Sequence, residues 1–193
     1  PAMTFAEMPY QRPDLAALKA DYNAITARLR AAASYADARA AFLDNDTLER
    51  RITTQATLAS IRHSIDTRDA FYDGEKKFWN AADPELQACR DEFTAALLES
   101  PFRADFAAEY GDLMFQNAEI ARKAFSPEIV PDLQKENDLA QEYEKLLASA
   151  QIPFEGGVYT LSQLSPYKTD ADDARRLAAW KAEGRWFKDN QPK

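Results

Sequence analysis

Apolar residues recur at intervals of three and four along most of the chain, which is the spacing of one buried face of an α-helix. A first helix is predicted to begin after Asp14, which can cap it, and to end before Ser34. A second begins at Ser34 and runs for about thirty residues without proline or glycine, until Asp66-Thr67 offers a break and a new cap. The stripes of these two helices are Leu15, Leu18, Tyr22, Ile25 and Leu29, and Phe42, Leu48, Ile52, Leu58, Ile61 and Ile65.

Five further helices are predicted in the middle of the chain. A third begins at Arg68, and Asp83-Pro84 begins a fourth, because proline suits the first turn of a helix better than its interior. Two more cap-then-proline pairs, Ser100-Pro101 and Ser126-Pro127, place helices at 101–110, 112–124 and 128–150. The expected core stripe of the last one is Ile129, Leu133, Ala140, Tyr143 and Leu147.

The pattern changes once, at residues 152–160, where two short β-favouring runs flank Gly156-Gly157 and predict a hairpin. A last helix follows, marked by Leu177, Trp180 and Phe187, with Trp186 beside that stripe. No repeat or low-complexity linker divides these segments. We therefore expect a mainly α fold: a single helical domain over 1–193, with long helices and one β-hairpin near 152–160.

Composition supports helix and restricts the chemistry. Alanine makes up about a fifth of the 193 residues, whereas valine occurs only at Val130 and Val158. There is one histidine, His63, and one cysteine, Cys89, so the chain cannot supply the ligands of an ordinary zinc site. A net charge of −8 argues against nucleic acid and anionic membranes as partners. With no apolar run long enough to span a membrane and no signal peptide, the expected location is cytoplasmic.

Each residue that could carry chemistry also has a structural interpretation. Ser60, Ser64 and Asp66 surround His63 in the sequence, but neighbours on one helix rarely point at a common atom, which favours a packing or ion-paired histidine over a catalytic triad. Cys89 has no second cysteine nearby and is interpreted as a small buried side chain. Ser165-Pro166-Tyr167-Lys168 matches a Ser-x-x-Lys pattern that is common by chance. Glu136-Asn137 is either a substrate contact or a buried polar pair bonded to neighbouring backbone.

Several stretches resemble one family. They are Phe5-x-x-Met8-Pro9-Tyr10-x-Arg12-Pro13, the run from Ala56 to Arg68 followed by Phe71-Tyr72-Asp73, Phe125 to Ile129, Glu136-Asn137-x-Leu139-x-x-x-Tyr143-x-Lys145-Leu146, and the hairpin leading into Thr160 to Leu164. Together they resemble the N-terminal part of oligoendopeptidase F-like proteins, of the thimet oligopeptidase superfamily. The match follows the chain in order over almost its whole length.

This resemblance implies a zinc metallopeptidase that cuts short peptides in a channel between two mostly helical halves. Its His-Glu-x-x-His signature, in which a zinc-bound water attacks the peptide and the glutamate is general base, is absent from this sequence. No catalytic or metal-binding residue is therefore carried over, and zinc is expected in the catalytic domain of the parent enzyme. The resemblance assigns this chain to the channel wall, with the oligopeptide substrate and its own catalytic domain as partners, and without activity alone.

Two further expectations concern surfaces. The candidates for substrate contact are Arg62, His63, Asp66, Arg68 and Tyr72, because polar and aromatic groups cluster there at a predicted helix break. The aromatic residues of the last helix are expected to leave an exposed apolar patch that drives self-association. The alternative function is a stand-alone, noncatalytic helical domain that binds a partner protein.

Overall fold

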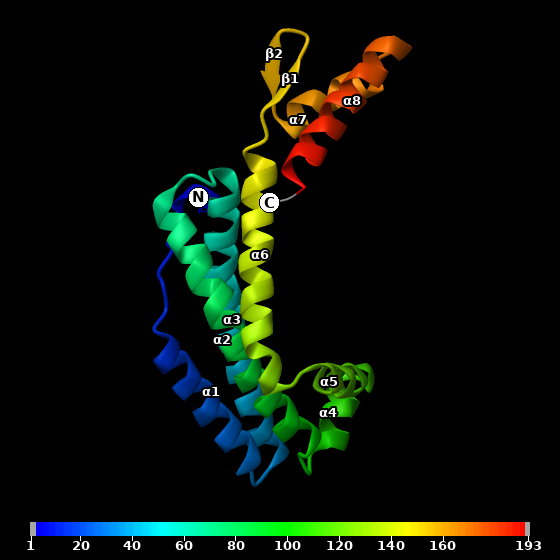
Figure 1. Ribbon diagram of the computed structural model, residues 1–193. Helices are drawn as coiled ribbons and strands as arrows, with labels where there is room; N and C mark the ends of the chain where they lie inside the picture. Colours follow the sequence, from blue (N-terminus) through cyan, green and yellow to red (C-terminus); the bar gives the residue numbers. More distant parts are fainter. Residues whose placement is uncertain (1–2, 192–193) are drawn as a thin grey trace. The chain divides into compact units, whose positions relative to one another are not determined.

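The computed structural model of the chain describes residues 3–191 and is mainly α, as predicted (Figure 1). Over that range it contains eight α-helices, three short 3-10 helices and one two-stranded antiparallel sheet. The chain divides into two compact units between Asp138 and Leu139, and each is described separately below. Helix α6 (Val130–Ala148) belongs to the first unit up to Asp138 and to the second from Leu139 onward.

The first unit consists of an N-terminal strap, residues 3–13, and a helical bundle. Its helices are α1 (Leu15–Arg30), α2 (Tyr35–Ile65), α3 (Ala70–Leu98), α4 (Arg103–Tyr110) and α5 (Leu113–Ala124), with 3-10 turns η1 (Phe5–Glu7) and η2 (Pro127–Ile129). Helices α1, α2 and α3 pack against one another. Buried leucine, isoleucine and aromatic side chains fill the space between them: Leu18, Tyr22 and Leu29 of α1, Leu48 and Ile52 of α2, and Leu86 and Phe93 of α3.

Local capping explains where the first helices begin. The Asp14 carboxylate accepts hydrogen bonds from the backbone N–H groups of Ala16 and Ala17, and the Ser34 hydroxyl accepts one from Asp37, as expected for both helix starts. The predicted start of the third helix at Arg68 is two residues early. Asp69, rather than Asp66-Thr67, caps α3, because its carboxylate accepts from the N–H groups of Phe71 and Tyr72.

The starts of α4 and α5 differ slightly from the prediction. The hydroxyl of Ser100 accepts a hydrogen bond from Phe102 N at 3.2 Å, which closes a turn over Pro101 before α4 begins at Arg103. Gly111 then ends α4 with a φ of 89°, a backbone conformation that favours glycine. The predicted separation of the 101–110 and 112–124 helices is therefore confirmed, with α5 beginning at Leu113.

The predicted start of a fourth helix at Asp83-Pro84 is wrong. Helix α3 continues from Ala70 to Leu98, and Pro84 lies inside it, buried. Proline has no N–H to donate to the carbonyl four residues earlier, which here is that of Asn80. An interior proline is therefore tolerated only if another group satisfies the backbone that it disturbs.

Helix α6 supplies that group. The Asn137 side-chain amide donates to Asn80 O at 3.1 Å, and the Gln134 side-chain amide donates to Ala81 O at 2.8 Å. In return the Asn80 side chain donates to Asn137 O at 3.4 Å, and Asn80 itself is 5% exposed. Asn137 is half-buried and its side chain bonds to neighbouring backbone, which is part of one of the two interpretations of Glu136-Asn137, whereas Glu136 is exposed.

The expected apolar stripe of the 128–150 helix is wrong in part. Ala140 and Tyr143 are exposed, whereas the polar Gln141 is only 3% exposed. The first part of α6 docks on α3 through the amides of Gln134 and Asn137, so the side that contacts α3 there is polar. A hydrophobic pattern could not indicate this side of the helix.

Three polar hubs join the elements of the first unit. In each hub one glutamate accepts a hydrogen bond from a tyrosine hydroxyl and an ion-paired hydrogen bond from an arginine. The first hub ties the strap to α3, the second joins α1, α2 and α3, and the third joins α2 to α4. Their members are Tyr10, Glu75 and Arg12; Tyr22, Glu49 and Arg90; and Tyr35, Glu109 and Arg39.

The second unit contains the predicted hairpin, β1 (Ile152–Phe154) and β2 (Gly157–Tyr159). Its turn is Glu155-Gly156 rather than Gly156-Gly157, because Gly157 pairs with Phe154 in the sheet. Both turn residues have positive φ, 46° and 79°, as a two-residue hairpin turn requires. Gly157 is needed for another reason: a Cβ built there would lie 2.8 Å from the ring of Tyr159.

The remaining elements of this unit are α7 (Leu161–Leu164), the 3-10 helix η3 (Ser165–Thr169) and α8 (Asp173–Asn190). A small core of Ile152, Phe154, Leu164, Ala179 and Ala182 holds the hairpin against α7 and α8. The residues that predicted α8 face outward: Leu177 and Trp180 are each 54% exposed and Phe187 is 40% exposed. The helix is therefore where the stripe predicted it, but its alanine side is the buried one.

Candidate functional site

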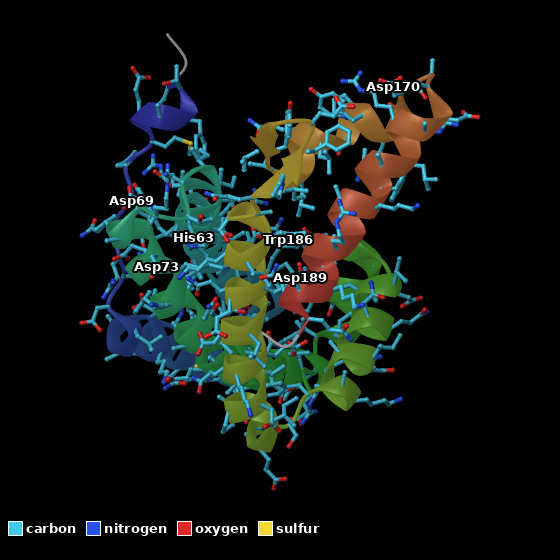
Figure 2. The ribbon with its side chains drawn as sticks, turned by 45° about the horizontal axis from the view of Figure 1, so that its top comes forward. His63, Asp69, Asp73, Asp170, Trp186 and Asp189 are labelled. Atoms are coloured by element: carbon cyan, nitrogen blue, oxygen red, sulfur yellow. The ribbon has the colours of Figure 1, made fainter. Side chains whose placement is uncertain are left out.

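The five candidate residues lie around the tight connection between the end of α2 and the start of α3. Figure 2 shows His63 on α2, with Asp69 and Asp73 at the beginning of α3. Four residues, 66–69, join the two helices, and Asp69 N donates to Asp66 O at 3.1 Å to close the turn. The five side chains point in three different directions, so the structure does not gather them into one cluster.

His63 is buried, with an exposed fraction of 0%. Its Nε2 atom lies 3.5 Å from the Asp73 carboxylate, and neither ring nitrogen has a hydrogen-bond partner in the described part of the chain. Asp73 also pairs with Lys77 at 3.0 Å. The histidine therefore faces an acid of α3 and not Asp66, which had been its nearest acid in the sequence.

Arg62 points away from His63, toward the N-terminal strap. Its guanidinium donates to Met8 O at 2.6 Å, to Phe5 O at 3.2 Å and to the Tyr72 hydroxyl at 2.8 Å. The guanidinium also lies 5.5 Å and 5.6 Å from the ring centroids of Phe5 and Tyr72. Arg62 and Tyr72 are therefore in contact with each other. The backbone that Arg62 binds is that of the chain's own strap.

Asp66 and Arg68 form a third, exposed group. The Asp66 carboxylate accepts from the Arg68 backbone N–H at 3.0 Å and from its guanidinium at 3.1 Å. The hydrogen bond from the backbone, followed by that from the side chain, lowers the pKa of Asp66. The Arg68 side chain is 90% exposed, so among the five candidates it is the one most open to an external ligand.

The strap carries a cluster that the sequence did not single out. Glu75, 4% exposed, is bound by Arg12 through Nε at 3.0 Å and through a terminal nitrogen at 2.6 Å, and it also accepts from the Tyr10 hydroxyl. Trp79 donates to the same hydroxyl at 3.2 Å. The Arg12 hydrogen bond lowers the pKa of Glu75, while burial and Glu75 raise the pKa of Tyr10. Tyr10 and Arg12 belong to the opening stretch that carried the family resemblance, but nothing in the sequence indicated the acid that they share.

The strap and the helices that it contacts lie within a stretch that matches a known protein family. Residues 5–125 match the family profile of the Peptidase M3 N-terminal domain. This chain belongs to that family. The resemblance to oligoendopeptidase F-like proteins is thereby confirmed.

Solved structures show the same fold as this M3 N-terminal domain. A structure named as an oligoendopeptidase F is 42% identical, with a TM-score of 0.95, and the match covers 99% of this chain and 34% of that one. Pz peptidase A with an inhibitor is 35% identical, with a TM-score of 0.94, over 98% of this chain and 34% of that one. A structure named as an oligoendopeptidase F from Bacillus anthracis is also 35% identical, with a TM-score of 0.94, over 99% and 35%.

The M3 N-terminal domain described here thus spans about a third of the length of the structures it matches. No curated protein matches it in a sequence comparison. Within residues 3–191, no helix is long and apolar enough to cross a membrane.

M3 peptidases depend on zinc, and the donors of this domain do not fit that ion. Zinc needs at least three protein ligands, but His63 has one acid, Asp73, near its ring, and the described residues contain no group of three histidine, cysteine or acidic side chains that could hold a metal. Cys89 is partly buried, and burial raises the pKa of its thiol, which opposes the thiolate form that binds metals. No step of a reaction is therefore assigned to a metal in this part of the molecule.

The other chemical patterns of the sequence are explained by structure. The Ser64 hydroxyl donates to Ser60 O at 3.0 Å, so this serine does not face the His63 ring. In the Ser-x-x-Lys pattern, Ser165 donates to Leu161 O at 3.2 Å and Lys168 pairs with Glu183. These side chains bond within their own unit instead of forming a nucleophile and base.

Proposed function

We propose that this chain is the substrate-channel-forming N-terminal domain of a zinc-dependent oligoendopeptidase that hydrolyses short peptides. The observation that carries the proposal is the match to the M3 N-terminal domain over residues 5–125, together with oligoendopeptidase structures that agree over nearly the whole chain. In this proposal the 193 residues act as one domain of the parent enzyme. The catalytic groups and the zinc ion belong to the remainder of that enzyme.

The chain alone is proposed to be inactive. It contains a single histidine and no His-Glu-x-x-His, so a zinc-bound water and its general base cannot be assembled from it. The test is to incubate the purified chain with zinc and a fluorescence-quenched oligopeptide. We expect no hydrolysis above buffer. Turnover that a chelator abolishes would contradict the proposal.

The turn between α2 and α3 is proposed to lie along the peptide path, with Arg62, His63, Asp66, Arg68 and Tyr72 as its residues. Arg68 is exposed and can contact a peptide directly, whereas Arg62 and Tyr72 bind the strap and would act by positioning it. In the full-length enzyme, substitution of Arg62 or Arg68 should raise KM more than it lowers kcat. An unchanged KM would remove these residues from the channel.

The partner proposed for the second unit is the enzyme's own catalytic domain. Within this unit, an apolar groove of about 480 Å³ lies between the end of α6 and α8, lined by Tyr143, Leu146, Leu147, Trp186 and Phe187. Tyr143 and Phe187 are exposed and the other three are half-buried, and an apolar surface of this kind marks an interaction site.

In the isolated chain, the same side chains, together with the exposed Leu177 and Trp180, should drive self-association. Light scattering as a function of concentration tests this. A chain that stays monomeric at high concentration would contradict it.

The second candidate function, a noncatalytic protein-interaction domain, rests on the same exposed surface. The two candidates differ in the partner that they require. A catalytic region produced separately from the same reading frame should bind this chain and gain peptidase activity if the first is correct. A stop codon directly after Lys193 would favour the second.

A further inference from the structure

An open groove lies between α2 and α3 in the first unit, and Asn137 of α6 also lines it. It has a volume of about 350 Å³. Its α2 wall carries the hydroxyl residues Thr53, Thr57 and Ser60, one helical turn apart, and its α3 wall carries Lys76 and Asp83 at corresponding levels, because the two helices run antiparallel (Figure 1). The apolar lining is formed by Ile52, Ala56 and Trp79.

The threonine hydroxyls of the groove are available for a ligand. A threonine in a helix commonly bonds its hydroxyl to the carbonyl four residues earlier. Thr54, outside the groove, does so, because its hydroxyl donates to Arg50 O at 2.7 Å. Thr53 and Thr57 line the groove and are exposed, and within residues 3–191 neither hydroxyl makes such a bond or has another protein partner.

Lys76 differs from the adjacent Lys77 because its ammonium lacks a carboxylate partner. The Lys77 ammonium pairs with Asp73 at 3.0 Å and is 61% exposed. Lys76 is a half-buried residue, and its ammonium lies 3.5 Å from the Ser60 hydroxyl with no carboxylate at ion-pairing distance among the described residues. At the other end of the groove, Asp83 is already paired with Arg90 at 2.8 Å.

We propose that this groove binds a short extended peptide by its C-terminal carboxylate, which Lys76 and Ser60 hold while Thr57 and Thr53 bond to the peptide backbone. An ammonium without a carboxylate partner favours an anionic group, and hydroxyls can both donate to and accept from a peptide unit. From residue 53 to residue 60 the α2 wall rises about 10 Å, the length of about three extended residues.

The peptide nature of this ligand rests on the proposed function. The preference for a carboxylate rests on Lys76 and the hydroxyls alone. The Lys76 end fixes the direction of the bound peptide, because the carboxylate lies there and the preceding residues extend toward Thr53 and Asp83.

The test is an NMR titration of the 193-residue chain with acetyl-trialanine, compared with the same peptide as its C-terminal amide. We expect the free carboxylate to shift the signals of Thr53, Thr57 and Lys76 and the amide to bind about tenfold more weakly, the loss of one charge-assisted hydrogen bond. No shift with millimolar free peptide, or equal binding of both peptides, would overturn the proposal. A third peptide, acetyl-Ala-Ala-Asp-amide, separates a side-chain carboxylate from a C-terminal one, and equal binding of it would overturn the C-terminal assignment.

Matched variants test whether peptide binding depends on Lys76 in the groove or only on the net charge of the chain. Lys76→Gln and Lys77→Gln remove the same charge from adjacent residues, and only the first should weaken binding, again by about tenfold. Lys76→Arg should retain binding, which shows that the site is still folded. Equal effects of the two glutamine variants would refute the site. Because this experiment needs no catalytic domain, its failure leaves the proposed function to be decided by the activity of the reconstituted enzyme.

Discussion

Asn137 of α6 satisfies a backbone carbonyl that Pro84 leaves without a helical partner, and this pairing allows a quantitative prediction. Asn137→Ala removes the 3.1 Å hydrogen bond from its side-chain amide to Asn80 O. Asn80 is only 5% exposed, so its carbonyl has little access to water. A buried acceptor left unpaired costs about 1–3 kcal/mol. We therefore expect the free energy of unfolding to fall by that amount, with the melting temperature decreasing by roughly 2–4 °C per kcal/mol in a chain of this size.

Pro84→Ala should make the Asn80 carbonyl independent of Asn137. Alanine at position 84 restores an N–H that can donate to Asn80 O along the helix, so the carbonyl no longer depends on Asn137. In the Pro84→Ala background, Asn137→Ala should cost only about 0.5 kcal/mol. The two substitutions should therefore be coupled by about 0.5–2.5 kcal/mol in a double-mutant cycle.

Urea denaturation of the four proteins, followed by circular dichroism, measures this coupling. Asn117→Ala is the matched control, because Asn117 is an exposed asparagine of α5. It should change stability by less than about 0.5 kcal/mol in either background. Additive effects of the Asn137 and Pro84 substitutions would show that the side-chain amide does not replace the missing helical bond, and the explanation of the interior proline would be wrong.

Three further predictions concern other contacts. Arg62→Lys keeps the charge but cannot bridge the strap carbonyls as a planar guanidinium does, so limited proteolysis should cut the strap faster, and an unchanged rate would count against the clamp. Gly157→Ala places a methyl 2.8 Å from the Tyr159 ring and should lower thermal stability by about 1–3 kcal/mol, whereas Gly184→Ala, which meets nothing within 4 Å, should not. The pKa of Glu109 is lowered to about 2 from 4.5 by its arginine and tyrosine partners, so its contribution is present above pH 4.5 and lost as the pH falls toward 2. Urea midpoints of Glu109→Gln should depend less on pH in that window, and identical profiles would contradict this.

The sequence predicted the helices well where local signals and tertiary contacts agree. Asp14 and Ser34 are strong caps, the apolar spacing of α1 is regular, and α2 contains neither proline nor glycine, so both helices lie where the sequence indicated. The Pro84 prediction failed because the signal was local and the compensation was not. A proline after an aspartate is typical of a helix start, and only the amide of a residue more than fifty positions away makes the interior position acceptable.

The candidate site was predictable in position but not in orientation. The turn between α2 and α3 carries the expected polar residues, yet Arg62 and His63, adjacent in the sequence, face different parts of the molecule. Which side each one faces depends on the strap and on Asp73, and neither partner follows from helical spacing. The Lys76 groove was missed for a similar reason: Lys76 and Lys77 are equivalent in the sequence, and only the ion pair with Asp73 distinguishes them.

The three tyrosine–glutamate–arginine hubs have a consequence for how the alanine-rich helices find one register. Alanine lets α-helices approach closely, but a smooth surface of small residues, such as Ala38, Ala41, Ala59 and Ala96 provide, packs almost equally well after a slide of one turn. A slide of α2 by about 5.4 Å relative to α3 and α4 would separate Glu49 from Arg90, and Glu109 from Arg39, and so leave both carboxylates without their arginine partners. The hubs therefore disfavour the shifted arrangements of helices that the hydrophobic core alone would allow.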